Sequence, residues 1–167
     1  MTAPTITPSE AVAPDRALFA ALERLHGHRC PMSILGARMG WAARAALGVN
    51  ADAWRRLRAC YHHRTCAVDG IQLATQCTAG NGNLELLAEG DHRLVLTALD
   101  EGRRAEARPT VQALQFGRRY GELRSQADQL PPGSAEERAL REHIAALLDH
   151  LETAPQEELA AVTLSSV

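Results

Sequence analysis

The sequence predicts an α+β domain in which N-terminal helices and a small antiparallel sheet precede a C-terminal helical hairpin. Three observations support this class. Apolar residues recur at helical spacing near the N-terminus, and residues 83–111 alternate in short segments between glycine-containing turns. The last third holds two amphipathic stretches on either side of a Pro-Pro-Gly sequence at residues 131–133. A chain of 167 residues suffices for one such domain with its own core.

Two helices are predicted in the N-terminal quarter of the chain. The first spans residues 15–25, with Asp15 as its N-cap. The second spans residues 31–47 and ends at Gly48. Two glycines four residues apart allow another backbone to pack closely against one face of the second helix: Gly36 and Gly40.

The middle of the chain carries a short helix and several candidate strands. Residues 53–62 begin with helical character and end with the alternation of a strand, and residues 66–74 form the expected short helix. Alternation then predicts strands over residues 83–87, 92–99 and 105–111, joined by acidic and glycine-containing turns. We expect these three strands to form a small antiparallel meander.

The C-terminal third is predicted to be a pair of helices, over residues 110–129 and 134–152. Ser134 and Glu137 form a capping box at the start of the second helix. Apolar residues at 3.6-residue spacing along this helix fit packing on the core or on a second copy of the chain. The periodicity leaves both arrangements open.

The predicted elements divide the chain into four parts. Residues 1–14, rich in Thr, Pro and Ala, are expected to be a disordered lead-in. Residues 15–111 are expected to form the α+β core, residues 112–153 the helical hairpin, and residues 154–167 a tail.

The composition excludes several classes of protein. A net charge of −2 gives no attraction to nucleic acid or to an anionic membrane. All 18 basic residues are arginine, so the chain has no lysine for a Schiff base or a phosphate-binding loop. No apolar run has the length of a membrane span, and the N-terminus lacks the pattern of a signal peptide. We expect a cytoplasmic protein with reduced cysteines.

Two segments concentrate the side chains that bind metals. Residues 26–31 read His-Gly-His-Arg-Cys-Pro, and residues 66–83 hold two further cysteines. Alternate residues of an extended segment point the same way, so His26, His28 and Cys30 can share one face. Thiolate and imidazole ligands in a small protein favour a metal site or a reactive thiol.

The second segment begins with Cys66, just before the predicted short helix. The free N–H groups at a helix N-terminus favour a thiolate, which suits a metal ligand or a nucleophile. Asp69 in the first turn has two interpretations. It is either an ordinary acidic residue at a helix start, which the sequence favours, or a base or an orienting partner for a ligand. The remaining cysteine outside these two segments, Cys60, is expected to be a small buried residue of a strand.

Cys77 follows Cys66 by eleven residues, and this separation decides whether the two thiols can bind the same metal ion. About eight helical residues at ~1.5 Å each separate the helix ends by ~12 Å. Two thiolates on one zinc ion lie within about 4 Å of each other. Both cysteines reach one ion only if the helix is shorter or the chain doubles back. Otherwise Cys77 has another role or meets a site on a second copy of the chain.

The two segments together resemble the FmdE family, named for a component of formylmethanofuran dehydrogenase. The resemblance covers about residues 20–110 and rests on four ordered blocks, at residues 26–31, 36–40, 66–72 and 77–84. It implies an α+β metal-binding domain, usually dimeric, and on this ground we expect a homodimer. The residues carried over as metal ligands are His28, Cys30, Cys66 and Cys77, with His26 and Asp69 in support.

The chain also departs from the family pattern. Met32, Gln76 and Asn81 replace residues common in the family beside the expected ligands, so the substrate or partner can differ. No cysteine follows Cys77, so we do not expect the C-terminal zinc ribbon that some relatives carry.

The leading hypothesis is a metal-binding protein with an accessory or catalytic role in redox or one-carbon metabolism. Zinc is the expected metal, with iron or haem as alternatives. The candidate catalytic residues are Cys30, Cys66 and Asp69, and the candidate cofactor-binding residues are His26 and His28.

Two other hypotheses stay open. One is a thiol enzyme or sulfur carrier that uses Cys66 or Cys30 as its nucleophile. The other is a structural zinc site in a helix-rich interaction protein. The sequence identifies neither the substrate nor a partner enzyme.

Overall fold

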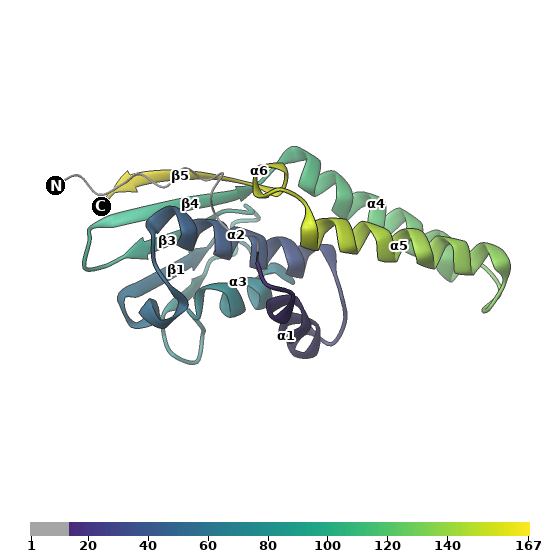
Figure 1. The fold of residues 1–167 in the computed structure, drawn as a ribbon, viewed down its shortest axis with the longest axis horizontal. Helices are drawn as coiled ribbons and strands as arrows, with labels where there is room; N and C mark the ends of the chain where they lie inside the picture. Colours follow the sequence, from purple (N-terminus) through teal and green to yellow (C-terminus); the bar gives the residue numbers. More distant parts are fainter. Residues whose placement is uncertain (1–13) are drawn as a thin grey trace.

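The computed structural model describes residues 14–167, so nearly all of the lead-in expected over residues 1–14 lies outside the described residues. The described chain forms helices packed on a sheet, with two long helices extending to one side (Figure 1). The elements in chain order are α1 (Arg16–His26), α2 (Pro31–Leu47), the 3-10 helix η2 (Ala51–Arg56), β1 (Leu57–Tyr61), α3 (Ala67–Thr75), β2 (Leu84–Leu86), β3 (Leu94–Ala98), β4 (Arg103–Pro109), α4 (Val111–Asp128), α5 (Ala135–Thr153), α6 (Gln156–Leu159) and β5 (Ala160–Ser166).

Within residues 14–167 the sheet has five strands in the order β2-β1-β3-β4-β5. The α+β class and the C-terminal helical hairpin of α4 and α5 are confirmed. The sheet is mixed, because β1 and β2 run parallel while the other neighbours are antiparallel. The helix α3 connects β1 to β2, and a crossover of this kind brings the second strand back parallel to the first. The expected meander does not form because β1 lies between β2 and β3.

The C-terminal residues 154–167, which were expected to be a tail, contain the short helix α6 and the edge strand β5. β5 pairs antiparallel with β4 along its whole length, from Arg103 opposite Ser166 to Pro109 opposite Ala160. Most residues of β5 are exposed, so it lacks the strong hydrophobic alternation by which a strand is recognised in sequence.

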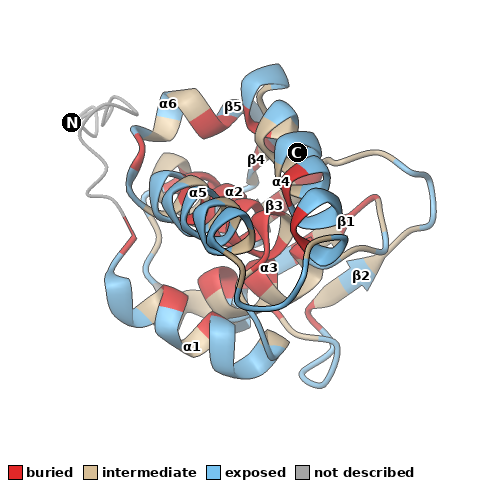
Figure 2. Ribbon diagram, turned by 90° about the vertical axis from the view of Figure 1, so that its right-hand side faces the viewer, coloured by how far each residue is buried: buried red, intermediate tan, exposed pale blue. Residues whose placement is uncertain are grey.

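The central helix of the fold is α2, which contacts both the sheet and the other helices. Met39 and Leu47 pack with the apolar residues of the strands. Ile34 and Leu35 pack with residues of α1 and α5. A helix that is apolar on all sides is typically buried, and Figure 2 shows α2 at the buried centre of the molecule. Among residues 14–167, none of the helices combines the length and the apolar character that crossing a bilayer requires.

Two glycines bring α2 and α3 into backbone contact. A Cβ atom at Gly70 would lie 2.0 Å from the Ser33 carbonyl oxygen, and one at Gly36 would lie 2.1 Å from the Ala67 carbonyl oxygen. Real Cβ atoms do not approach backbone this closely, so only glycine fits at either position. The contact holds the first turns of α3 against the start of α2.

A buried arginine fastens the hairpin to α2. The Arg38 side chain is fully buried and donates hydrogen bonds to the carbonyl oxygens of Glu152, at 3.2 Å, and Ala154. These carbonyls belong to the end of α5, where they have no partner within the helix. Burial lowers the pKa of Arg38, and the carboxylates of Glu157 and Glu158 act against this shift.

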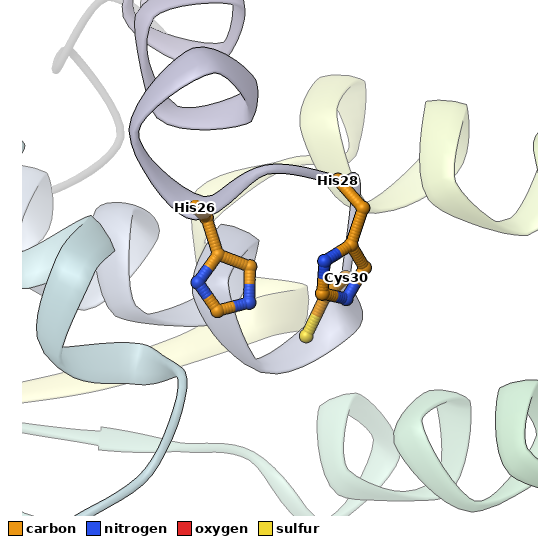
Figure 3. A group of neighbouring side chains, drawn as sticks. All are labelled: His26, His28 and Cys30. Atoms are coloured by element: carbon orange, nitrogen blue, oxygen red, sulfur yellow. The ribbon is translucent and has the colours of Figure 1, made fainter.

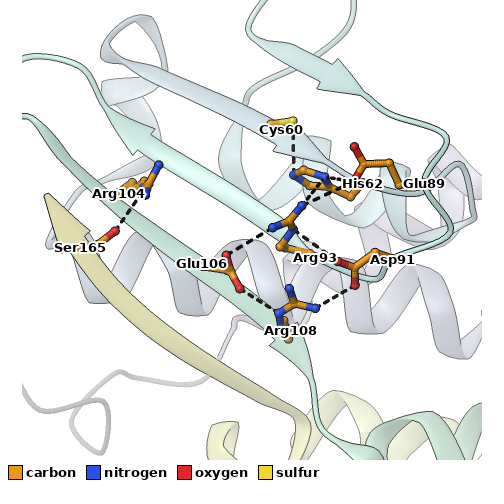
Figure 4. A network of polar contacts seen from close by, with 9 residues as sticks. All are labelled: Cys60, His62, Glu89, Asp91, Arg93, Arg104, Glu106, Arg108 and Ser165. Atoms are coloured by element: carbon orange, nitrogen blue, oxygen red, sulfur yellow. Dashed lines mark hydrogen bonds and ion pairs between the residues drawn. The ribbon is translucent and has the colours of Figure 1, made fainter. Parts of the chain in front are cut away.

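The face of the sheet turned away from α2 carries a network of ion pairs (Figure 4). Arg93 lies within 3.4–3.9 Å of carboxylate oxygens of Glu89, Asp91 and Glu106. Arg108 pairs with Asp91 and Glu106 at 2.8 Å. Exposed pairs of this kind each contribute about 1 kcal/mol or less, so the network keeps this face polar more than it stabilises the fold.

The glycine contact leads to a test of the fold. We expect Gly70→Ala to lower the free energy of unfolding by about 1–3 kcal/mol, because the new methyl group forces α2 and α3 apart. The matched control is Gly121→Ala, where an added Cβ meets nothing within 4 Å. In that helical position alanine is expected to stabilise by about 0.5–1 kcal/mol. Urea unfolding midpoints measure both effects, and equal shifts would contradict the assigned contact.

Candidate metal centre

The loop between α1 and α2 gives the His-Gly-His-Arg-Cys segment its shape. Gly27 ends α1 in the left-handed conformation, with φ of 85°, and its N–H donates to the Glu23 carbonyl at 2.8 Å. Cys30 is extended, with φ of −146° and ψ of 138°, and serves as the N-cap of α2. A reversal at Gly27 followed by extended backbone turns alternate side chains of this loop toward one another.

His26, His28 and Cys30 form a compact cluster. One ligand atom from each residue lies within 4.8 Å of the other two, and the three side chains are directed into the same space (Figure 3). The two imidazole rings have centroids 4.7 Å apart. Ligand atoms on one zinc ion lie up to about 4 Å apart, so small side-chain rotations bring this cluster to coordination distance.

The strongest sign of a metal ligand is the hydrogen bonding of His26. Its Nδ1–H donates to Oδ2 of Asp69 at 2.7 Å. The opposite ring atom, Nε2, is buried and has no hydrogen-bond partner among the described residues. Histidines that bind metals typically have this arrangement, in which a carboxylate fixes the ring and leaves the other nitrogen for the ion. The residues present therefore fit a bound metal.

Asp69 reaches His26 from the first turn of α3. The close packing at Gly70 places this turn beside the start of α2. Of the two interpretations of Asp69, the geometry favours the one in which it orients a ligand.

Cys66 lies beside the cluster but does not belong to the group of three ligand atoms within mutual reach. Partial burial and the neighbouring Cys30 thiol raise the pKa of Cys66, although the residue is exposed overall. The helix N-terminus was expected to favour a thiolate, and here desolvation and the second thiol act in the opposite direction. A bound cation beside both sulfurs would favour the thiolate forms.

Cys77 lies apart from the other candidate ligands. It is fully buried in the core between α3 and the sheet, and its backbone N–H donates to Oγ1 of Thr75 at 3.1 Å. The helix α3 spans Ala67–Thr75, nine residues or ~13 Å, and carries Cys77 to its far end. The structure thus does not bring Cys77 together with His28 and Cys30. Within the described residues Cys77 behaves as a small apolar core residue.

Arg29 has a role that was not predicted from the sequence. It forms ion pairs with Asp149 at 2.7 Å and Glu152 at 2.9 Å. Both carboxylates belong to α5, so these pairs tie the ligand loop to the hairpin. Its partners lie 120 and 123 residues further along the chain, so no local sequence signal identifies them.

The expected burial of Cys60 was only partly correct. This half-buried residue faces the outside of the sheet, with Sγ 3.7 Å from Nε2 of His62. Nδ1 of His62 lies 2.7 Å from Glu89, in the network of Figure 4. Burial and nearby carboxylates raise the pKa of Cys60, which keeps the thiol protonated. Cys60 and His62 are two residues apart at the end of β1, which is the signal that places them on one face.

The fold and the site define an α+β protein with a His/Cys group that can hold a metal ion. The chain belongs to the FmdE family, whose model is described as "FmdE, Molybdenum formylmethanofuran dehydrogenase operon" and matches residues 25–161.

Two similar proteins illustrate this relationship. The crystal structure of a tungsten formylmethanofuran dehydrogenase FmdE-like protein from Syntrophus aciditrophicus shares the fold, with a TM-score of 0.59 and 20% identity over 97% of this chain and 78% of that chain. A probable S-adenosyl-L-methionine-binding protein of Archaeoglobus fulgidus is 40% identical over 83 residues, which cover 47% of this chain and 23% of that protein. The chain thus spans less than a quarter of this curated relative.

The positions of Cys30 and Cys77 lead to opposite expectations for metal binding. We expect Cys30→Ala to weaken zinc binding at least about tenfold, because a thiolate ligand is lost. Cys77→Ala is expected to leave zinc affinity unchanged and to lower the melting temperature, because it opens a small cavity in the core. Competition with a chromogenic chelator measures both affinities. A loss of zinc affinity in Cys77→Ala alone would contradict the assignment.

Proposed function

We propose that this protein binds a zinc ion at His26, His28 and Cys30 and uses it in one-carbon or redox metabolism. The observation that carries the proposal is the buried Nε2 of His26, which has no partner among the described residues while Asp69 holds the other nitrogen. Membership of the FmdE family supports the metabolic assignment.

The types of ligand favour zinc. Two imidazoles and one thiolate suit a borderline-soft divalent ion and disfavour magnesium and calcium, which prefer oxygen ligands. Iron is the next candidate on the same grounds. Three protein ligands with a fourth position left for substrate are typical of catalytic zinc sites. Cys66, which lies beside Cys30, is the candidate for a fourth protein ligand instead.

The residues around the ion would have distinct roles. A bound metal would act as a Lewis acid. Asp69 would fix the ring of His26, and the exposed His28 would form the side of the site that faces solvent. The proposal does not include S-adenosylmethionine, because the match to the relative of that description covers less than a quarter of its length.

The proposal includes a homodimer in the cytoplasm. The hairpin of α4 and α5 extends away from the sheet (Figure 1), and few of its residues are buried within one chain: Ala113, Leu123, Ala127, Leu148 and Leu151. A second copy of the chain that packs on the hairpin would bury more of its apolar surface. Light scattering at micromolar concentration tests the dimer, and a monomer would contradict it.

Metal analysis of the untagged protein tests the metal site. We expect about one zinc ion per chain, and we expect Asp69→Asn to lower zinc affinity about 10–100-fold because the ring of His26 is no longer held by a carboxylate. Asp100→Asn, which removes an exposed carboxylate paired with Arg56, is the matched control and is expected to bind zinc normally.

Three outcomes would contradict the proposal. The first is a stoichiometry near zero after zinc or iron is added. The second is equal affinity in Asp69→Asn and the parent protein, which would remove the assigned role of the carboxylate. The third is a Soret band in the purified protein, which would favour the haem alternative.

A further inference from the structure

A hollow of about 370 Å³ lies between the ligand loop and the helical hairpin. His28 forms its wall on the side of the metal cluster, and the opposite walls come from α4 and α5. The hairpin residues that line it are Tyr120, Arg124, Arg141, Ile144 and Leu148. Its volume is at the lower end of the range for small-molecule pockets. The hollow is therefore the space from which a small ligand would reach the cluster.

The lining offers mainly hydrogen-bond donors. Among the described residues no carboxylate lines the hollow, and its polar side chains are guanidinium groups, one imidazole and one phenol. Ile144 and Leu148 provide an apolar part. A ligand that matches this lining is a small molecule with oxygen acceptors at one end, which face the donors, and an apolar part that contacts Ile144 and Leu148. Guanidinium groups bind carboxylate and phosphate oxygens in this way.

The three arginines of the lining differ in how many donors they have left. Arg29 uses Nε and Nη2 for two carboxylates of α5, Glu152 and Asp149, and among the described residues only its Nη1 has no partner. Arg141 pairs with Asp128 through Nη2 and with Glu137 through Nε. Among the described residues its Nη1 group therefore remains available for a ligand. Arg124, on the other helix, contacts Asp128 through Nε at 3.8 Å and keeps both Nη groups for a ligand.

The balance of charge decides how a ligand would bind here. The three arginines are paired with four carboxylates, those of Asp128, Glu137, Asp149 and Glu152, which offset the positive charge of the lining. Long-range attraction of anions is therefore weak, and directed N–H donors provide the recognition. Bound oxygen atoms would accept from Arg124 and Arg141.

We propose that this hollow is the substrate subsite of the metal centre and takes a small organic anion, whose carboxylate or phosphate group is bound by Arg124 and Arg141. The other end of the ligand would lie beside His28. This inference rests on the proposed function for the role of the metal, whereas anion binding at the arginines needs no metal.

Titration of the full-length protein with inorganic phosphate and, separately, with acetate tests the subsite. Binding is followed by NMR of the side-chain Nε–H signals of arginine at constant ionic strength. We expect saturable shifts for Arg124 and Arg141 with at least one anion, and the anion that binds more tightly identifies the chemical group. Arg124→Gln is expected to weaken binding about tenfold or more, through loss of a charge-assisted hydrogen bond.

Arg119→Gln is the matched control on the same helix. Arg119 pairs with Glu122 and does not line the hollow, so this variant is expected to bind the anion as the parent does. Equal weakening in both variants would show general electrostatic attraction and overturn the subsite. Absence of saturable shifts with both anions would overturn it as well. Unfolding midpoints check that both variants remain folded.

A second arm separates this inference from the proposed function. The titration is repeated on the Cys30→Ala variant after treatment with a chelator. Saturable anion binding that persists there supports the subsite even if the parent protein binds no metal. Normal zinc binding in the parent without anion binding would leave the metal site in place and overturn the subsite.

Discussion

The backbone contact between α2 and α3 is the constraint on which the rest of the structure depends. At Gly36 and Gly70 the two helices approach so closely that no side chain fits between them. This approach brings Asp69 within 2.7 Å of His26, and it leaves the thiols of Cys30 and Cys66 as neighbours at the two helix N-termini. Helix packing in the core thus adds residues of α3 to the ligands that the loop before α2 provides.

Arginines connect the site to the C-terminal hairpin. Arg38 satisfies carbonyls at the end of α5 from inside the core, and Arg29 pairs with two carboxylates on the same helix. The planar guanidinium group can bridge several acceptors at once, which a lysine ammonium group does less well. The sequence contains no lysine, and in this fold arginines join segments that lie far apart along the chain.

Much of the local structure could be predicted because its signals are local. Asp15 caps α1, Pro31 begins α2 and Gly48 ends it, and Ser134 accepts from the N–H of Glu137 at the start of α5. The order of the strands could not be predicted, because the parallel pairing of β1 with β2 depends on where α3 packs. The strand β5 was missed because its residues form an exposed edge with little hydrophobic alternation.

The sequence by itself determined the helices α1 to α5, the α+β class and the spacing that lets His26, His28 and Cys30 converge, because each depends on signals from residues close together along the chain. Tertiary structure decided the rest of the site. It gave His26 the carboxylate of Asp69, separated by 43 residues, and it placed Cys77 in the core. The physical reason is that α3 is rigid and tightly packed, so it brings the residues at its start to the site and carries those at its end away.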